Sequence, residues 1–284
     1  MKGTLQNARD TAAGLKLPPI SATFDATQVT SLLQMVPAAT KMPNEARYAL
    51  DAQIAARLAP PAIEDETPLS PEHSHELTAT KIALSRSLRW EVTRQFSSPN
   101  DLVERARFFS DFAKIIHTFE GEFRGSFAEF AVQELLANAH DNWLIQRHAS
   151  EVATPRVSAS ARRDITGFEF AVTDYTGTVP PPMRPYLFEH HFNGREVLEQ
   201  LTPETAWLAG CQEDFWPLRP GLPNELAKRS IKANTGLPLI GGCGAGLAIT
   251  RKRALETGCG YFYQNLGGGG SKFGITIPYS FKQP

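Results

Sequence analysis

Apolar residues recur at helical spacing in the segment that follows Ser126. Phe127, Ala131 and Leu135 stand four residues apart, so they form one stripe that should pack inward. Ser126 and Glu129 have the spacing of a capping box, which predicts that the helix begins here. The middle of the chain is therefore expected to hold an amphipathic helix.

The same periodicities predict further elements on both sides of this helix. The other helices of this part of the chain are expected over 98–119 and 247–258. Alternating apolar and polar positions predict strands over 82–96, 156–161, 167–173, 261–265 and 271–278. The last two strands should form a hairpin, because the run Gly267–Gly270 between them suits a turn.

The first part of the chain is predicted to be a helical extension. Asp25 suits the cap of a short helix over 26–36, and Pro43 suits the first turn of another that reaches Leu58. Residues 59–71 are rich in proline and acidic residues and are typical of a linker. We expect an extension over 1–80, packed on the main domain or on a partner, and one larger domain over 81–284.

Composition narrows the class of protein. With 42% hydrophobic and 21% charged residues, the chain of 284 residues has the make-up of a globular domain. Its net charge of −1 gives no reason to expect nucleic acid or an anionic membrane surface as a partner. No apolar run reaches a membrane span, the N-terminus lacks a signal-peptide core, and the three cysteines lack metal-ligand spacing. A cytoplasmic protein is expected.

Three polar residues share one face of the central helix. Glu134 and Asn138 are separated by one turn, and Asp141 continues the stripe. A carboxamide oxygen can bind a hard cation, and a carboxylate can order water or accept a proton. The stripe therefore suits a bound magnesium nucleotide, although a solvated polar face has the same pattern.

Two glycine-containing segments could complete such a site. Asp174 stands at a strand end before Gly177, where it could accept a hydrogen bond from an exocyclic amine or simply open a hairpin turn. Glycines at three alternate positions precede the last helix, and their amides could approach a phosphate. These residues are Gly242, Gly244 and Gly246, followed by Leu247.

Two histidine-containing segments indicate other kinds of chemistry. Residues 181–240 are rich in proline and are predicted to form a lid, and His190 and His191 within it lack partners at metal-ligand spacing. The run around His75 is similar to the phospho-acceptor box of sensor histidine kinases, but the Arg-Thr-Pro-like continuation is missing. His75 is more simply interpreted as a linker histidine.

Taken in order, four segments resemble the conserved boxes of the GHKL superfamily, the Bergerat-fold ATPases. Glu134 to Ala139 resembles the N box, and Asp174 with Gly177 resembles the first glycine box. Gly242 to Leu247 resembles the second box, and Gly270–Ser271 before a strand resembles the last. Thr176 and Thr178 stand where the first box has glycines.

This resemblance implies a fold and a set of roles. The expected fold is α+β, a two-layer sandwich with a mixed β-sheet and helices on one face. Asn138 would bind Mg²⁺, Asp174 the adenine amine, and Glu134 would be the general base. Gly242, Gly244, Gly246, Leu247, Ser271, Gly177 and Asp141 would complete the ATP site.

The function expected from the resemblance is that of an anti-sigma-factor serine kinase or a related ATPase. The protein would bind ATP with Mg²⁺ and hydrolyse it, or transfer a phosphoryl group to a regulatory protein partner. A homodimer also fits this expectation. The alternatives are a non-catalytic module that senses nucleotide and a degenerate sensor histidine kinase that uses His75.

Overall fold

The computed structural model describes most of the helices and strands expected from the sequence. The described residues are 39–58, 71–96, 107–149, 156–175, 246–266 and 270–280, with Ser31, Gln34, Val179, Arg184, Leu187, Phe188 and Lys232. Most of the predicted helix over 26–36, of the predicted lid and of the predicted linker over 59–71 lies outside this part of the chain, and Pro71 is the first residue of a helix.

The described residues form one five-stranded sheet with the order β1-β2-β3-β5-β4. Its strands are β1 (Trp90–Phe96), β2 (Val157–Arg163), β3 (Gly167–Asp174), β4 (Gly260–Leu266) and β5 (Gly270–Pro278). All pairs of neighbouring strands are antiparallel. The expectation of a mixed sheet is therefore wrong.

Connections through helices explain this antiparallel order. Between β1 and β2 the chain runs back along the sheet in α6 (Ser110–Glu120) and forward again in α7 (Glu122–Ala149). It thus returns to the end where β1 finished, and β2 must run the other way. At the opposite edge, β3 and β4 run in the same direction. They are not neighbours, because β5 lies between them and is antiparallel to both.

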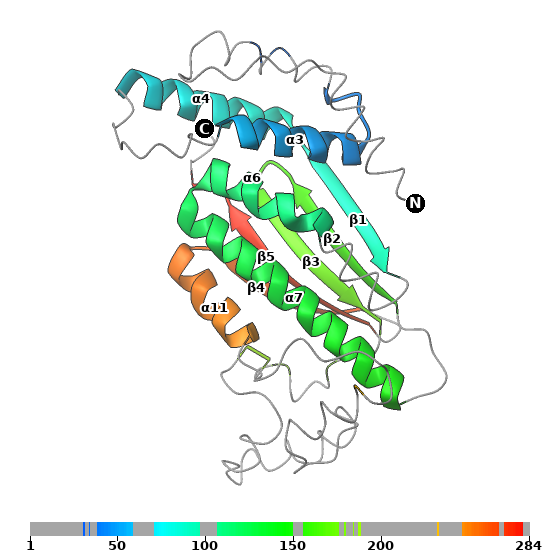
Figure 1. Ribbon diagram of the computed structural model, residues 1–284. Coiled ribbons are helices and arrows are strands. Elements are labelled where there is room, and N and C mark those ends of the chain that lie inside the picture. Colours follow the sequence, from blue (N-terminus) through cyan, green and yellow to red (C-terminus); the bar gives the residue numbers. More distant parts are fainter. Residues whose placement is uncertain are drawn as a thin grey trace.

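Helices cover one face of the sheet, so the fold is α+β with two layers, as expected. Figure 1 shows α6, α7 and α11 (Gly246–Thr257) on the same side of the strands. Successive side chains of a strand point to opposite faces, so Phe168, Phe170 and Val172 of β3 share one face. All three are buried against these helices. The other face carries ion pairs from Glu169 to Arg162, at 2.8 Å, and to Lys272, at 3.2 Å.

Helix α7 begins earlier than the capping box predicts. Its first residue is Glu122, and Ser126 is an exposed residue within the helix. Only Gly121 separates it from α6, and the φ of 90° at this glycine lets the chain turn back at once. A Cβ on Gly125 would lie 2.6 Å from His117 Cβ, so the bare glycine allows α6 and α7 to pack closely from the first turn.

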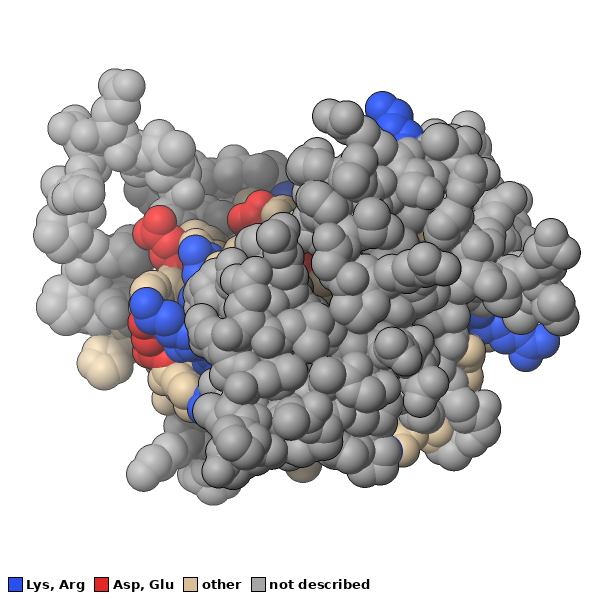
Figure 2. Space-filling view, turned by 90° about the horizontal axis from the view of Figure 1, so that it is seen from below, with Lys and Arg blue, Asp and Glu red and all other residues tan. Residues whose placement is uncertain are grey.

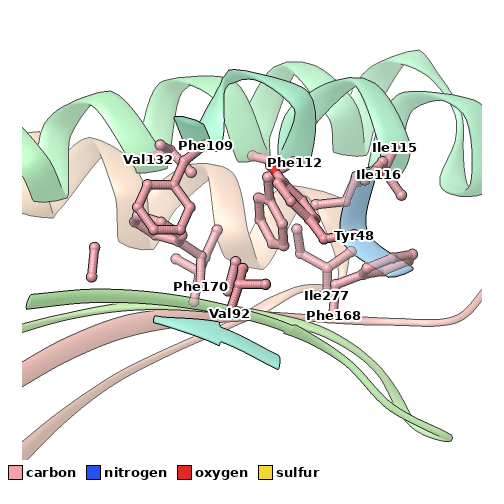
Figure 3. Packing of buried hydrophobic residues seen from close by; sticks show 14 of the residues in the cluster. Tyr48, Val92, Phe109, Phe112, Ile115, Ile116, Val132, Phe168, Phe170 and Ile277 are labelled. Carbon is pink, nitrogen blue, oxygen red and sulfur yellow. The ribbon is translucent and has the colours of Figure 1, made fainter. Parts of the chain in front are cut away.

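The predicted inward stripe of α7 is confirmed. Phe127, Ala131 and Leu135 expose 3% of their surface or less. They join aromatic rings from α6 and β3, as Figure 3 shows for Phe112 and Phe170, whose centroids lie 5.7 Å apart. The helix layer and the sheet therefore share one hydrophobic core.

The strand predicted over 82–96 is correct only in its second half. Residues 82–87 belong to α4 (Pro71–Ser87), and β1 starts at Trp90. Leu84 and Leu88 are both buried, and their four-residue interval also suits a helix. The domain boundary expected after residue 80 lies within α4.

The predicted helix from Pro43 to Leu58 is present as α3 (Asn44–Leu58), and it packs on the main domain. Tyr48, Leu50 and Ile54 are each 2% exposed or less and belong to the common core. The hydroxyl of Tyr48 donates to the carbonyl oxygen of Phe108 at 3.0 Å. Helix α3 is thus an integral part of this core.

The strands around the central hairpins also agree with the sequence. Strands β2 and β3 match the predicted pair, and β4 and β5 form the predicted hairpin, with Leu266 opposite Gly270. Helix α11 ends at Thr257, one residue before Gly258, whose φ is 66°. Among the helices that the structure describes, none combines the length and apolar content required to cross a membrane.

Candidate functional site

Helices α7 and α11 lie side by side and run in opposite directions. Near the start of α7, Arg124 Nε donates to the carbonyl oxygen of Thr257, at the end of α11, at 3.1 Å. Further along, the Arg253 guanidinium stacks 4.3 Å from the Phe130 ring centroid. This alignment brings the middle of α7 to the N-terminus of α11.

At this N-terminus, Glu134 meets Gly246. The carboxylate oxygen Oε2 of Glu134 occupies the space where a Cβ on Gly246 would stand, so only glycine fits here without displacing the carboxylate. Burial raises the pKa of Glu134 above the usual glutamate value of 4.5. The N-box-like and second-glycine-box-like segments are far apart in sequence, yet Glu134 of the first lies against Gly246 of the second.

The predicted adenine-binding residue Asp174 lies opposite Ser271. The two are register partners on β3 and β5, and Ser271 is in turn the partner of Asn265 on β4. Asp174 is 7% exposed and Ser271 is 4% exposed. Because Phe170 and Ile275 occupy the same parity on these strands and are buried in the core, this polar row also faces the helices.

Asn138 reaches the same end of the sheet as this row. Arg124 Nη1 donates to the carbonyl oxygen of Pro278 at 2.6 Å, which fixes α7 to the far end of β5. From there Asn138 lies about 21 Å along the helix at ~1.5 Å per residue. Ser271 lies about 23 Å along the strand at ~3.3 Å per residue. The side chain of Asn138 is exposed at this end.

Asp141 follows on the same helix, next to a buried histidine. Its Oδ1 lies 3.0 Å from Nδ1 of His140, which is 3% exposed. This contact holds the carboxylate of Asp141 against the imidazole of His140, the preceding residue in the chain. Asp141 thus stands three residues after Asn138 on α7, with one carboxylate oxygen already in contact with His140.

The remaining predicted residues have three different outcomes. Leu247 is partly buried and packs against the core from the first turn of α11. Gly177, Gly242 and Gly244 lie outside the described residues. His75 is exposed on α4, which leads into the start of β1 at the sheet end opposite Asp174 (Figure 1).

The side-chain atoms at this end of the sheet that could bind a metal ion are amide, hydroxyl and carboxylate oxygens. Within the described ranges, no three histidine, cysteine, aspartate or glutamate side chains gather as a metal site. Figure 2 looks at the molecule from below and shows both acidic and basic described side chains at the margin of that face. Neither sign of charge dominates what is visible there.

Sequence reasoning missed one member of the polar row. Asn265 stands opposite Ser271 because Leu266 pairs with Gly270 across the hairpin turn. The predicted hairpin already contained this information, since a four-glycine turn before Ser271 fixes the approximate register. It could therefore have been found by extending the strand pairing one step beyond the turn.

Neither the models of protein families, nor the curated proteins, nor the solved structures gave a match to this chain.

Proposed function

We propose that this protein binds Mg²⁺ and ATP at the end of the sheet where β3 finishes, and that it hydrolyses ATP or transfers its γ-phosphoryl group. The observation that carries the proposal is the contact between Glu134 and Gly246. In this contact Glu134, a candidate proton acceptor, lies against the N-terminus of α11, which follows a glycine-rich segment. GHKL ATPases, which the sequence resembles, combine these two features in one site.

Asp174 is proposed to recognise the base. It is nearly buried, so a hydrogen bond from the amine of adenine to its carboxylate would be shielded from water. Guanine carries a carbonyl oxygen at that position and would be repelled by a carboxylate. Ser271, the register partner of Asp174, would add a hydroxyl on the same side.

The N-terminus of α11 is proposed to bind the phosphates. The first amides of a helix lack partners within the helix and point outward with partial positive charge. Gly246 is the first residue of α11, so its amide belongs to this first turn, beside the Glu134 carboxylate. Residues of the preceding glycine segment would add further backbone amides.

The exposed amide of Asn138 would hold Mg²⁺ together with phosphate oxygens. A hard cation with few protein ligands suits this arrangement, because Mg²⁺ keeps several waters and binds mainly through the nucleotide. When bound, the ion would neutralise negative charge on the phosphates. We also propose that the fold is a Bergerat fold. The two layers, with helices on one face of the sheet, support this proposal.

Glu134 is proposed to accept a proton from water or from the hydroxyl of a regulatory protein. Its raised pKa makes the carboxylate a stronger base than an exposed glutamate. Its position against the first residue of α11 puts it beside the proposed phosphate site. A base so placed would act on the group that attacks the terminal phosphate.

A single-turnover assay with terminally labelled ATP tests this proposal. Release of free phosphate would indicate hydrolysis, and label on serine of an added protein fraction would indicate transfer. Acid-labile label on the chain itself would instead favour His75 as acceptor and contradict the role given to Glu134. Binding of ATP without any turnover would reduce the function to nucleotide sensing.

A further inference from the structure

Tyr263 on β4 carries a hydroxyl that has no hydrogen-bond partner among the described residues. Its oxygen is buried and forms no hydrogen bond in the described structure. The ring packs against Phe273 on β5, with centroids 5.0 Å apart and planes inclined by 53°. Leaving a buried hydroxyl unpaired costs free energy, so such a group calls for an explanation.

The sheet register directs Tyr263 toward the helix layer. It pairs with Phe273, which pairs with the core residue Val172 on β3. Two residues further along β4, on the same face, comes Asn265 in the polar row with Ser271 and Asp174. Two residues of a strand span about 7 Å, so the tyrosine adjoins this row.

Tyr263 lies on the side of the row nearer to α11. Neighbouring strands are about 4.8 Å apart, so β4 is about 10 Å from β3, with β5 between them. Helix α11 packs against both α7 and β4. Asp174, which we assign to the base, is on β3, whereas the N-terminus assigned to phosphate belongs to α11. Tyr263 therefore belongs to the strand that lies nearer to the phosphate side than to the base side.

We propose that the Tyr263 hydroxyl donates a hydrogen bond to a phosphate oxygen of the bound nucleotide. This inference rests on the proposed function. A neutral phenol can donate one hydrogen bond to a charged oxygen, and such bonds are stronger than those between neutral groups. The ring is already packed on Phe273, so the hydroxyl is the part of the side chain that remains to bind a ligand.

The test is Tyr263→Phe, which removes the hydroxyl and keeps the ring. Calorimetric titration of the full chain should show ADP binding about tenfold more weakly, the loss expected for one hydrogen bond to a charged group. Adenosine, which has no phosphate, should bind as it does to wild type. The ligand-free variant should unfold at the same temperature or higher, because an unsatisfied hydroxyl has been removed from the interior.

Tyr261→Phe is the matched control. Tyr261 lies on the same face of β4, opposite Ile275 and one repeat further from the polar row. Its ring packs on Phe188 at 4.6 Å, a contact that phenylalanine preserves. This variant should bind ADP and adenosine like wild type.

Three results would overturn the assignment of Tyr263. Unchanged ADP affinity would exclude the phosphate contact, and an equal loss for adenosine would place the hydroxyl on the nucleoside. A lower unfolding temperature without ligand would mean that the hydroxyl has a structural partner. If wild type itself fails to bind ADP, the proposed function fails as well, so the two failures are distinguishable.

Discussion

Asp51 on α3 and Arg163 on β2 form an ion pair in which both side chains are fully buried. Arg163 Nη1 lies 2.5 Å from Asp51 Oδ1 and 2.6 Å from Oδ2. Trp90 Nε1 also donates to Asp51, at 2.8 Å, and Arg163 Nε donates to the hydroxyl of Tyr279 at 3.1 Å. This network joins α3, the strands β1 and β2, and the residue after β5.

The first prediction concerns the stability of this network. Asp51→Ala should lower the free energy of unfolding by about 3–5 kcal/mol, because Arg163 would remain buried without its counter-charge. Urea denaturation followed by tryptophan fluorescence measures the change. Glu45→Ala is the control, since its contact with Arg94 is longer, at 3.5 Å, and partly exposed. That control should cost less than ~1 kcal/mol.

A double variant separates the cost of an unpaired charge from the cost of lost packing. Asp51→Leu with Arg163→Met should be clearly more stable than Asp51→Ala, because apolar residues of similar size can replace a buried ion pair with little loss. If Asp51→Ala is no less stable than Glu45→Ala, the ion pair does not anchor α3 to the sheet.

The second prediction concerns the fit between Gly246 and Glu134. In Gly246→Ala the new methyl group would collide with the Glu134 carboxylate and displace it. Single-turnover phosphate release should fall by roughly 10²-fold or more, the contribution typical of a positioned base. The helix itself tolerates alanine, so the unfolding temperature should change little.

Leu255→Ala provides a control on the same helix. Leu255 is 65% exposed, so truncating it changes the surface of α11 and removes little buried contact. Turnover in this variant should equal that of wild type. Unchanged turnover in Gly246→Ala would instead show that the position of Glu134 against α11 does not matter for the chemistry.

The third prediction is a pH dependence that originates in Glu134. Burial raises the pKa of this carboxyl, and a base acts only when it is ionised. The single-turnover rate should therefore rise with pH through a pKa above the usual 4.5 and then level off. Glu134→Gln should bind ATP within a few-fold of wild type, while its residual rate should lack this rise.

The raised pKa of Glu134 also determines how this residue makes the stability of the fold depend on pH. A carboxyl with a raised pKa in the folded state binds its proton more tightly there, so its contribution to stability is present at low pH. That contribution is lost as the pH rises through the folded-state pKa. Glu134→Gln should remove this decline. A variant that loses stability at every pH without any change in turnover would make Glu134 a structural residue.

Local periodicity predicted much of this fold, and the exceptions have physical causes. The stripe from Phe127 to Leu135 and the hairpin of β4 and β5 follow from contacts that are near in sequence. The start of α7 was misplaced because Gly121 turns the chain directly from one helix into the next, where a capping box was expected. The strand predicted from residue 82 failed because Leu84 and Leu88 satisfy both periodicities.

Long-range features were harder to predict from the sequence. An aspartate among the apolar residues of α3 gives no indication that its partner is Arg163, more than a hundred residues away. The direction of each strand depends on how many helices lie between it and the preceding strand and on how they pack. The periodicity within one helix or strand does not predict this. For the candidate site, the sequence proposed Glu134, Asp174 and Gly246, whereas the row with Asn265 required the register.

The most direct test of the central claim is a calorimetric titration of Mg²⁺-ATP into wild type and Asp174→Asn, with GTP as the competing ligand. Wild type should bind ATP with one site per chain and prefer it to GTP, because the carboxylate accepts from the adenine amine and repels the guanine carbonyl. Asp174→Asn should bind ATP more weakly and lose most of this preference. Absence of ATP binding to wild type at millimolar nucleotide would contradict the account, as would equal affinities and an unchanged preference in the variant.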